Sequence, residues 1–552
     1  MASLHGAAAI PHGPPPPRPR RIEAAAGAPG GWLLDGGRIA VATGDVWGVI
    51  RQSLQADPAA PCIRCAATTM TRRQVLDAVD GLPWERPYRR VGLHVPRSLA
   101  SVLLTLAVWR NGGVYVPIAV EYPLAGVVGI AAACDLDMVV ADRRLDLPGY
   151  PRLRTIACAG QTLFLHARDD PAGPDPTGPD PAGDNRDICY IAHTSGSTGA
   201  PKGVMVSHAN LLNRLACMRG FLELTPADRL LYKTSAVFDV HVWEFTLPLA
   251  GGCLLVIYPQ TRHFDLFEVA RLIALEGVSV VGFVPALLRL LLDNAGFVAG
   301  NRLRAVLCGG EAWGVPLARE FHARLPGCRL FNSYGPTETT IAVANWPVPA
   351  DAALEQIRLG GPLPNTVFLI EDTVPDAADA DGRIVGPLAI GGAQVALGYI
   401  DERGRDRFFE RAIDGETVRF YRTGDLVRLD PANGALHFKG RQDRQVKVNG
   451  TRIELEEIEE AVCAVDGVEG CVAFLVSNGL TSQLCAVYKT RRNLPMPPAE
   501  IKAGCARLLP APLLPTRLQQ VAEFPLGANG KIDRASLIAG FVSVQQDRRA
   551  RP

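Results

Sequence analysis

Short apolar runs alternate with longer stretches of helical periodicity through most of the chain. The runs have the length of strands and lie at Val91–Val95, Val114–Ile118, Met138–Ala141, Leu254–Tyr258, Val278–Val284 and Arg304–Cys308. Apolar residues spaced three and four apart predict helices over Ala100–Arg110, Leu211–Gly220, Leu266–Leu275 and Leu287–Asn294. This alternation predicts an α/β architecture with largely parallel sheets.

The pattern changes beyond Val385, where strands dominate. Two of the strands are expected at Val418–Tyr421 and Ala435–Phe438, and an amphipathic helix is expected at Glu454–Ala464. Residues 466–490 read as two further strands. The chain therefore predicts a β-rich subdomain, followed by a small C-terminal α+β domain.

A chain of 552 residues exceeds what one hydrophobic core supports. We expect a large core domain over 31–442 and a small domain over 443–540. Residues 1–30, rich in Ala, Gly, Pro and Arg, are expected to be a disordered extension, and 541–552 a flexible tail. The stretch 168–187 contains an Asp-Pro-x-Gly unit three times, which predicts an exposed loop within the large domain.

The composition of the chain limits which binding partners and which cell compartment we expect. A net charge of +1 favours neither nucleic acid nor an anionic membrane. Polar residues, glycine or proline interrupt every apolar run short of the ~18–20 residues that span a bilayer, and the first residues do not resemble a secretory signal. The cysteines are scattered, and Cys189, Cys253 and Cys308 lie in apolar runs, which predicts buried thiols and a cytoplasmic location.

The segment 190–204 carries the strongest chemical signal. It reads Tyr-Ile-Ala-His-Thr-Ser-Gly-Ser-Thr-Gly-Ala-Pro-Lys-Gly-Val, with glycines, hydroxyls and one lysine between two apolar segments. Backbone amides and hydroxyls of such a loop can surround a polyphosphate. The order of residues differs from the standard phosphate loop, in which the lysine follows a glycine directly. A plain surface loop is the alternative.

The pattern S-G-S-T-G-x-P-K-G resembles the adenylate-forming superfamily, which includes acyl-CoA synthetases, luciferases and the adenylation domains of nonribosomal peptide synthetases. Further motifs of the family follow in the same order, at 112–118, 238–244, 332–340, 421–425, 440–447 and 529–533. Departures are His241 for the usual serine, Asn449 for an arginine and Pro387 for a glutamate. The resemblance is strongest to a free-standing amino-acid adenylation domain.

The resemblance implies a fold and a reaction. The fold would be a large domain of α/β subdomains and a β-rich subdomain, with a small mobile C-terminal domain that turns at Asp443. The enzyme would use ATP and Mg²⁺ to convert an amino acid into aminoacyl-AMP, with release of pyrophosphate. The aminoacyl group would pass to the phosphopantetheine thiol of a separate carrier protein in nonribosomal peptide or related antibiotic biosynthesis. The resemblance leaves open whether the enzyme also requires a small activating partner protein.

The resemblance also assigns a nucleotide site. Lys531 would lie between the substrate carboxylate and the α-phosphate, with Lys202, Thr337 and Glu338 as further catalytic groups and Glu338 on the magnesium ion. Asp425 would accept from the ribose hydroxyls. The full expected ATP and AMP site comprises Thr194, Ser195, Gly196, Ser197, Thr198, Gly199, Lys202, Gly310, Glu311, Asn332, Ser333, Tyr334, Gly335, Thr337, Asp425, Arg441 and Lys531.

Asp239 bears on what is activated. In the resembling family this aspartate pairs with the α-amino group of an amino acid, and a partly buried carboxylate requires a cation. The expected substrate wall is Phe238, Asp239, Val240, Trp243, Gly282, Leu307, Gly309, Ser333, Ile341 and Ala342. This mostly apolar wall favours a neutral amino acid of small to medium size, although bridging water leaves polar or basic side chains open.

Three other functions remain open at this point. An aryl- or acyl-CoA ligase would have no use for the Asp239 carboxylate. An amide ligase would pass the adenylate directly to a small amine. A non-catalytic nucleotide-binding protein would have no need for Lys531, Glu338 and Asp425 together.

Overall fold

The computed structural model describes residues 19–22, 31–84, 88–169, 187–194, 202–260, 264–371, 373–375, 382–401, 404–448, 451–526 except 478–481, and 532–550. The chain forms two compact units. The first comprises Met1–Val120, Ala131–His193 and Gly203–Asp443, and the second comprises Glu121–Ile130, Thr194–Lys202 and Arg444–Pro552.

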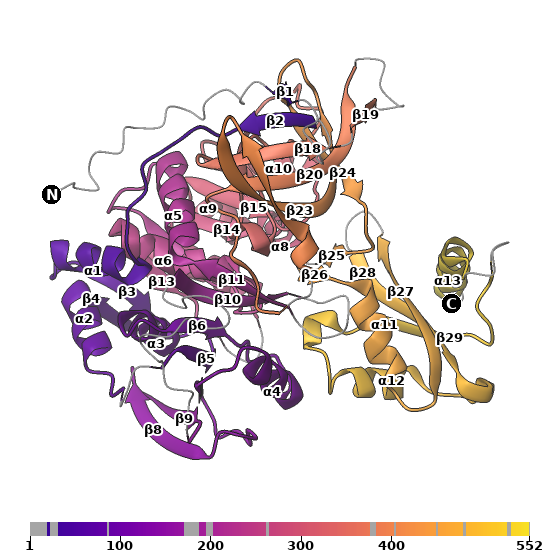
Figure 1. Cartoon of the computed structure of the whole chain (residues 1–552), viewed down its shortest axis with the longest axis horizontal. Helices are drawn as coiled ribbons and strands as arrows, with labels where there is room; N and C mark the ends of the chain where they lie inside the picture. The colour runs from indigo at the N-terminus through magenta and orange to yellow at the C-terminus, as the bar shows by residue number, and fades with distance from the viewer. Residues whose placement is uncertain are drawn as a thin grey trace. The chain divides into compact units, whose positions relative to one another are not determined.

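Two large sheets with parallel centres dominate the first unit (Figure 1). One has the order β17 (Ala344–Val348), β16 (Arg329–Tyr334), β15 (Ala305–Gly309), β14 (Val280–Phe283), β12 (Arg229–Tyr232), β13 (Leu254–Ile257), β3 (Pro61–Cys65) and β4 (Thr68–Thr71). The other has the order β21 (Gly398–Tyr399), β11 (Lys202–Ser207), β10 (Ile188–Thr194), β6 (Val114–Pro117), β5 (Arg90–His94), β7 (Met138–Ala141), β9 (Gln161–Ala167) and β8 (Arg152–Cys158). We call them the β12 sheet and the β5 sheet.

Helices lie between these two sheets and on the far face of the β12 sheet. One core cluster joins side chains of both sheets to α1 (Val46–Ala56), α2 (Arg72–Asp80), α3 (Leu99–Arg110), α5 (His208–Leu222) and α6 (Val240–Gly251). A second cluster joins the other face of the β12 sheet to α7 (Leu266–Glu276), α8 (Pro285–Leu292), α9 (Ala295–Gly300) and α10 (Val315–Arg324). The all-round apolar sequence of α3 reflects burial on every side.

An antiparallel sheet forms the β-rich part of the first unit. Its order is β1 (Arg20–Ile22), β2 (Gly31–Asp35), β18 (Thr366–Glu371), β20 (Ile384–Gly392), β23 (Glu416–Leu429) and β22 (Phe408–Ile413), with β19 (Val374–Pro375) on β20 and β24 (Leu436–Arg441) on β23. Figure 1 shows the indigo strand β2 beside β18, so the start of the chain completes a sheet built from its later half.

The second unit has a smaller sheet of β27 (Val468–Ser477), β28 (Ser482–Thr490) and β29 (Arg517–Gln520), and a ribbon of β25 (Val446–Val448) and β26 (Thr451–Ile453). Its core is made with α11 (Leu455–Cys463) and α12 (Pro498–Cys505), and α13 runs over Arg534–Ala550. The helix α4 spans Leu124–Ala133. Among the described helices, none has both the length and the apolar character needed to cross a bilayer.

The α/β class predicted from the sequence is confirmed, and each strand and helix predicted above is present. Their bounds agree within a few residues except for β23, which continues to Leu429 although its end was expected at Tyr421. Cys189, Cys253 and Cys308 are buried thiols, as predicted. Two stretches differ in detail. Strand β1 lies inside the expected disordered extension, and α13 continues through residues expected to form a flexible tail. Residues 170–186 of the expected Pro/Gly-rich loop lie outside the described part of the chain.

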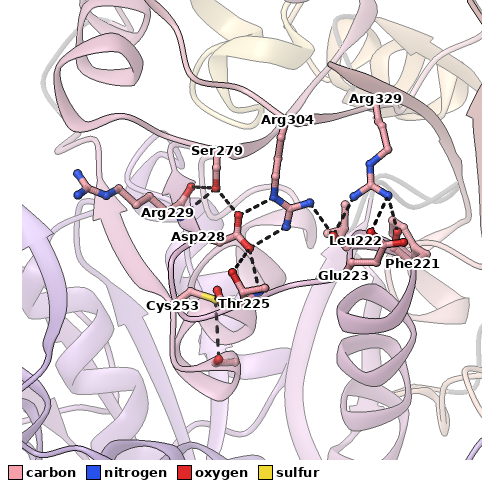
Figure 2. Close-up of polar contacts among 11 residues, drawn as sticks. Phe221, Leu222, Glu223, Thr225, Asp228, Arg229, Cys253, Ser279, Arg304 and Arg329 are labelled. Atoms are coloured by element: carbon pink, nitrogen blue, oxygen red, sulfur yellow. Dashed lines mark hydrogen bonds and ion pairs between the residues drawn. The ribbon is translucent and has the colours of Figure 1, made fainter. Parts of the chain in front are cut away.

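An ion pair between the buried Asp228 and the half-buried Arg304 ties α5 to the amino-terminal edge of the β12 sheet (Figure 2). Arg304 donates from Nε and Nη2 to the two oxygens of Asp228 at 2.6 and 2.7 Å, and from Nη1 to the carbonyl of Leu222 at 2.7 Å. Ser279 donates to the same carboxylate at 2.7 Å. Burial raises the pKa of Asp228, but the hydrogen bonds from Arg304, the Thr225 amide and Ser279 outweigh it and leave the pKa below its usual range.

We predict that Asp228→Asn lowers the free energy of unfolding at pH 7 by about 2–4 kcal/mol, because it strands a partly buried guanidinium. A carboxylate with a depressed native pKa stabilises above its unfolded pKa of ~3.9, and this stabilisation is lost as pH falls through the native value. Urea unfolding of both proteins should therefore show a difference that persists down to about pH 4 and shrinks below it.

The matched control is Asp77→Asn, whose carboxylate pairs with Arg73 on an exposed helix face. It should change stability by less than about 1 kcal/mol. Equal losses in the two variants would contradict the structural importance of the Asp228 network.

Candidate active site

The loop between β12 and α6 is anchored by the buried side chain of Glu244, which is 0% exposed. Its Oε2 accepts from the backbone amides of Lys233 and Thr234 at 3.0 and 2.8 Å, and its Oε1 accepts from the Thr234 hydroxyl at 2.7 Å. The Lys233 ammonium lies 3.6 Å from Oε1. Burial lowers the pKa of Lys233, and the Glu244 carboxylate offsets part of that shift. The anchor fixes the start of α6.

Asp239 stands at the residue before α6, and its side chain does not cap that helix. It is half-buried, between Phe238 and Val240, which are also half-buried. A protein cation lies near it: Arg214 of α5 is 1% exposed, and burial lowers its pKa to about 10 while the charges of Cys217, Asp239 and Tyr190 offset part of the shift. The motif around Asp239 pointed only to a substrate ammonium as its cation, and the proximity of Arg214 carries no signal in that motif.

Four of the expected wall residues share one face of the β12 sheet at its carboxyl edge. The register aligns Gly282 with Leu307 and Gly309 with Ser333 on three neighbouring parallel strands. Side chains two residues apart on a strand point the same way, so this row faces the helices α5 and α6. A Cβ on Gly282 would lie 3.1 Å from Cζ2 of Trp243, which shows that the indole of α6 already covers that glycine.

The next segment, 339–342, is held in an unusual backbone conformation. Thr340 and Ile341 have φ of 58° and 74°, a left-handed region that a β-branched residue rarely adopts. Gln394 maintains it, because its Nε2 donates to the carbonyl of Ala342 at 2.8 Å and its backbone carbonyl accepts from the Thr340 hydroxyl at 2.8 Å. Strain of this kind gathers at functional sites, where surrounding structure supports it.

Three residues of the expected nucleotide site, Tyr334, Asp425 and Arg441, form one connected group. Tyr334 donates its hydroxyl to Oδ2 of Asp425 at 2.6 Å, and Arg441 pairs with the other oxygen of that carboxylate. Arg441 also donates from Nε and Nη2 to Asp443 at 2.6 and 2.8 Å. Burial, followed by the Asp425 charge, raises the pKa of Tyr334 well above its usual value. The Asn332 amide accepts from the Trp313 indole at 2.9 Å and donates to the Arg358 carbonyl at 2.7 Å.

Glu338 lies in the short helix η3 (Thr337–Thr339), which directly follows the strand β16 and Gly335-Pro336. Its side chain is 1% exposed, and Oε1 accepts from the hydroxyl of Tyr399 at 2.7 Å. The described residues contain no cluster of three or more His, Cys, Asp or Glu arranged for a metal. A single carboxylate fits Mg²⁺ bound mainly through water and phosphate oxygens, which is how this ion binds in many nucleotide sites.

Several expected residues cannot be placed. Ser195, Gly196, Ser197, Thr198, Gly199 and Lys531 lie outside the described residues. Thr194 ends β10, Lys202 begins β11, and both are half-buried. Gly310, which has φ of 90°, and Glu311 directly follow β15. Asp443 is the last residue of the first compact unit. Its role as a hinge stays a prediction.

Comparison with known proteins agrees with this arrangement. A sequence model of the family described as AMP-binding enzyme matches residues 51–400. The chain belongs to that family. Tyrocidine synthase 3 from Brevibacillus parabrevis is 34% identical over 82% of the chain, which spans 7% of that relative. The solved structure of PA1221, described as an NRPS protein containing adenylation and PCP domains, has a TM-score of 0.72 and 26% identity over 90% of this chain and 97% of that one.

A second solved structure is AB3403, a four-domain nonribosomal peptide synthetase bound to AMP and glycine. It has a TM-score of 0.59 and 27% identity over 91% of this chain and 37% of that one. Together these matches show an adenylate-forming enzyme of the adenylation type found in nonribosomal peptide synthetases. Enzymes of the AMP-binding family use ATP.

Within this AMP-binding enzyme, His241 has a structural role. Its Nδ1 donates to the carbonyl of Phe238 at 2.6 Å, and its Nε2 accepts from the hydroxyl of Tyr115 at 3.0 Å, which assigns the neutral tautomer. Burial lowers the pKa of His241 to about 4, and the bond to Phe238 offsets part of that shift. The histidine thus joins β6 to the residue before Asp239.

We predict that His241→Asn makes stability less dependent on pH. The unfolded histidine takes up a proton as pH falls below about 6.5, whereas the native one stays neutral to about pH 4, so stability is lost across that window. Between pH 7 and 5 the wild type should lose about 2 kcal/mol more than the variant, measured by urea unfolding.

Tyr115→Phe is the matched control, because it removes the same hydrogen bond and retains the titrating ring. It should lower stability at both pH values while keeping a pH dependence close to that of the wild type. Identical pH dependence in wild type and His241→Asn would show that the imidazole has the same pKa in the native and unfolded states, and would contradict its burial in the neutral form.

Proposed function

We propose that this enzyme converts an amino acid into aminoacyl-AMP with release of pyrophosphate, and then transfers the aminoacyl group to the phosphopantetheine thiol of a carrier protein with release of AMP. The observation that carries the proposal is the position of Asp239. It precedes α6, whose Trp243 covers Gly282 at the edge of the row of wall residues. A carboxylate at that position would pair with the α-ammonium of an amino acid, a group that aryl and fatty acids lack.

The chemistry requires charge neutralisation more than proton transfer. The substrate carboxylate attacks the α-phosphate of ATP, both partners are anionic, and pyrophosphate leaves. In the proposal Lys531 holds the reacting oxygens, and Lys202 with the hydroxyl groups of Thr194 and Thr337 binds phosphate. Asp425, oriented by Tyr334 and Arg441, accepts from the ribose hydroxyls. Mg²⁺ bound at Glu338 would supply further charge stabilisation on the phosphates.

The acceptor is proposed by chemical analogy. PA1221 is an NRPS protein that contains both adenylation and PCP domains, and it shares the fold of this chain over nearly its whole length. We therefore propose a carrier domain as the thiol acceptor. A loading assay that offers all three acceptors tests this proposal. Transfer to coenzyme A or to a small amine, and not to the carrier thiol, would contradict it.

We predict that Asp239→Ala lowers kcat/KM for amino-acid-dependent ATP–pyrophosphate exchange by about 30- to 1,000-fold, because the variant loses a buried charge pair with the substrate. Asp239→Asn, which keeps the shape and removes the charge, should lose nearly as much. Unchanged exchange in both variants would point to a carboxylic acid without an amine and would favour the aryl- or acyl-CoA ligase.

We also predict that Lys531→Ala abolishes most adenylation while leaving ATP binding within a few-fold of wild type, because the lysine stabilises charge that develops during the reaction. Equilibrium binding of ATP and single-turnover formation of the adenylate separate the two effects. Equal adenylation rates in variant and wild type would refute the assigned role.

A further inference from the structure

A carboxamide continues the row of wall residues beyond Ser333. The antiparallel register of β16 and β17 places Asn345 directly opposite Ser333. Directly paired residues of an antiparallel ladder have side chains on the same face. The contact confirms this, because the Ser333 hydroxyl donates to Oδ1 of Asn345 at 2.7 Å. Asn345 therefore lies on the face of the sheet that carries Gly309, Leu307 and Gly282.

The other end of this amide is a buried donor. With Oδ1 taken by the Ser333 hydroxyl, Nδ2 of Asn345 is buried and has no hydrogen-bond partner among the described residues. A buried amide donor that finds no acceptor costs about 1–3 kcal/mol. The serine hydroxyl also orients the amide, because it presents its proton to the oxygen end and so turns the N–H end away from itself.

Glycine and apolar residues surround Ser333 in the row of wall residues. Gly309 is the strand partner of Ser333 on the other side, and it contributes no side chain to the row. A Cβ there would lie 2.3 Å from the Ser333 carbonyl oxygen, so no larger residue fits that backbone. The remaining wall side chains near this point are apolar, as with Leu307, Ile341 and Ala342. They offer no acceptor for the Asn345 N–H.

We propose that Asn345 is a specificity residue that selects a neutral amino acid whose side chain carries an acceptor oxygen, a hydroxyl or a carboxamide. The Ser333 hydroxyl holds the Asn345 amide so that its N–H donates to that oxygen. The substrate thus satisfies a donor that the protein leaves unmatched, and an apolar isostere would leave it buried and unpaired. This inference rests on the proposed function and deepens it.

The test is amino-acid-dependent ATP–pyrophosphate exchange on the full-length enzyme with pairs of nearly equal shape. The pairs are serine and 2-aminobutyrate, threonine and valine, and asparagine and leucine. We expect the oxygen-bearing member of the best-used pair to have a kcat/KM about 10- to 100-fold higher. Preference for the apolar member in every pair, or for donor side chains such as 2,4-diaminobutyrate, would overturn the proposal.

Two variants assign the preference to this residue. Asn345→Leu removes both ends of the amide, and it should reduce the polar-to-apolar ratio to near one. Asn345→Asp keeps an acceptor for Ser333 and replaces the donor with an anion, so it should reject the carboxamide substrate and improve use of 2,4-diaminobutyrate relative to wild type. Asn433→Asp, in an exposed turn, is the control and should leave every ratio unchanged.

The possible results distinguish a failure of the Asn345 inference from a failure of the proposed function. Thermal unfolding and ATP binding of each variant establish that it is folded. Both folded Asn345 variants could still catalyse amino-acid-dependent exchange with the polar-to-apolar kcat/KM ratios of the wild type. That result would contradict this inference and leave the proposed function intact. Exchange with aryl or fatty acids alone would defeat both.

Discussion

The buried carboxylate of Glu244 is the interaction on which the candidate site depends. It accepts hydrogen bonds from two consecutive backbone amides and one hydroxyl at the end of β12, and it faces the Lys233 ammonium. Such a charge is tolerated in a protein interior only with a cation and a full set of donors. Because Glu244 itself belongs to α6, these bonds determine where the helix starts, and with it the positions of Asp239 and Trp243.

The rest of the pocket is built on rigid strand ends. Parallel strands place successive side chains of one face in a row at their carboxyl edge, where ligands commonly bind in α/β sheets. Here the row has glycine at positions 282 and 309, because the Trp243 indole covers the first and the Ser333 backbone closely approaches the second. The strained turn at Thr340 and Ile341 closes one end of the wall, held by the buried amide of Gln394. Sites on such supports hold their geometry better than sites on loops.

The fold class and the strand–helix order followed from apolar periodicity, because strands buried on both faces read as short apolar runs. The candidate site followed from motifs, and Glu244 was within one of them. Arg214, Gln394 and Asn345 carry no local signal of this kind. They matter through contacts with residues from 12 to 55 positions away, such as the bonds from Ser333 to Asn345 and from Gln394 to Thr339. Register between strands and burial of side chains decide those contacts, and both require the tertiary structure.

The most direct test of amino-acid activation is ATP–pyrophosphate exchange with the wild-type enzyme across a broad panel of amino acids, aryl acids and fatty acids. The row of wall residues, with Asp239 directly before α6, predicts strong exchange with one amino acid or a narrow group of related ones. It predicts none with acids that lack an α-amine. Silence with every amino acid, together with exchange driven by an aryl or fatty acid, would contradict the role of Asp239 and the function proposed from it.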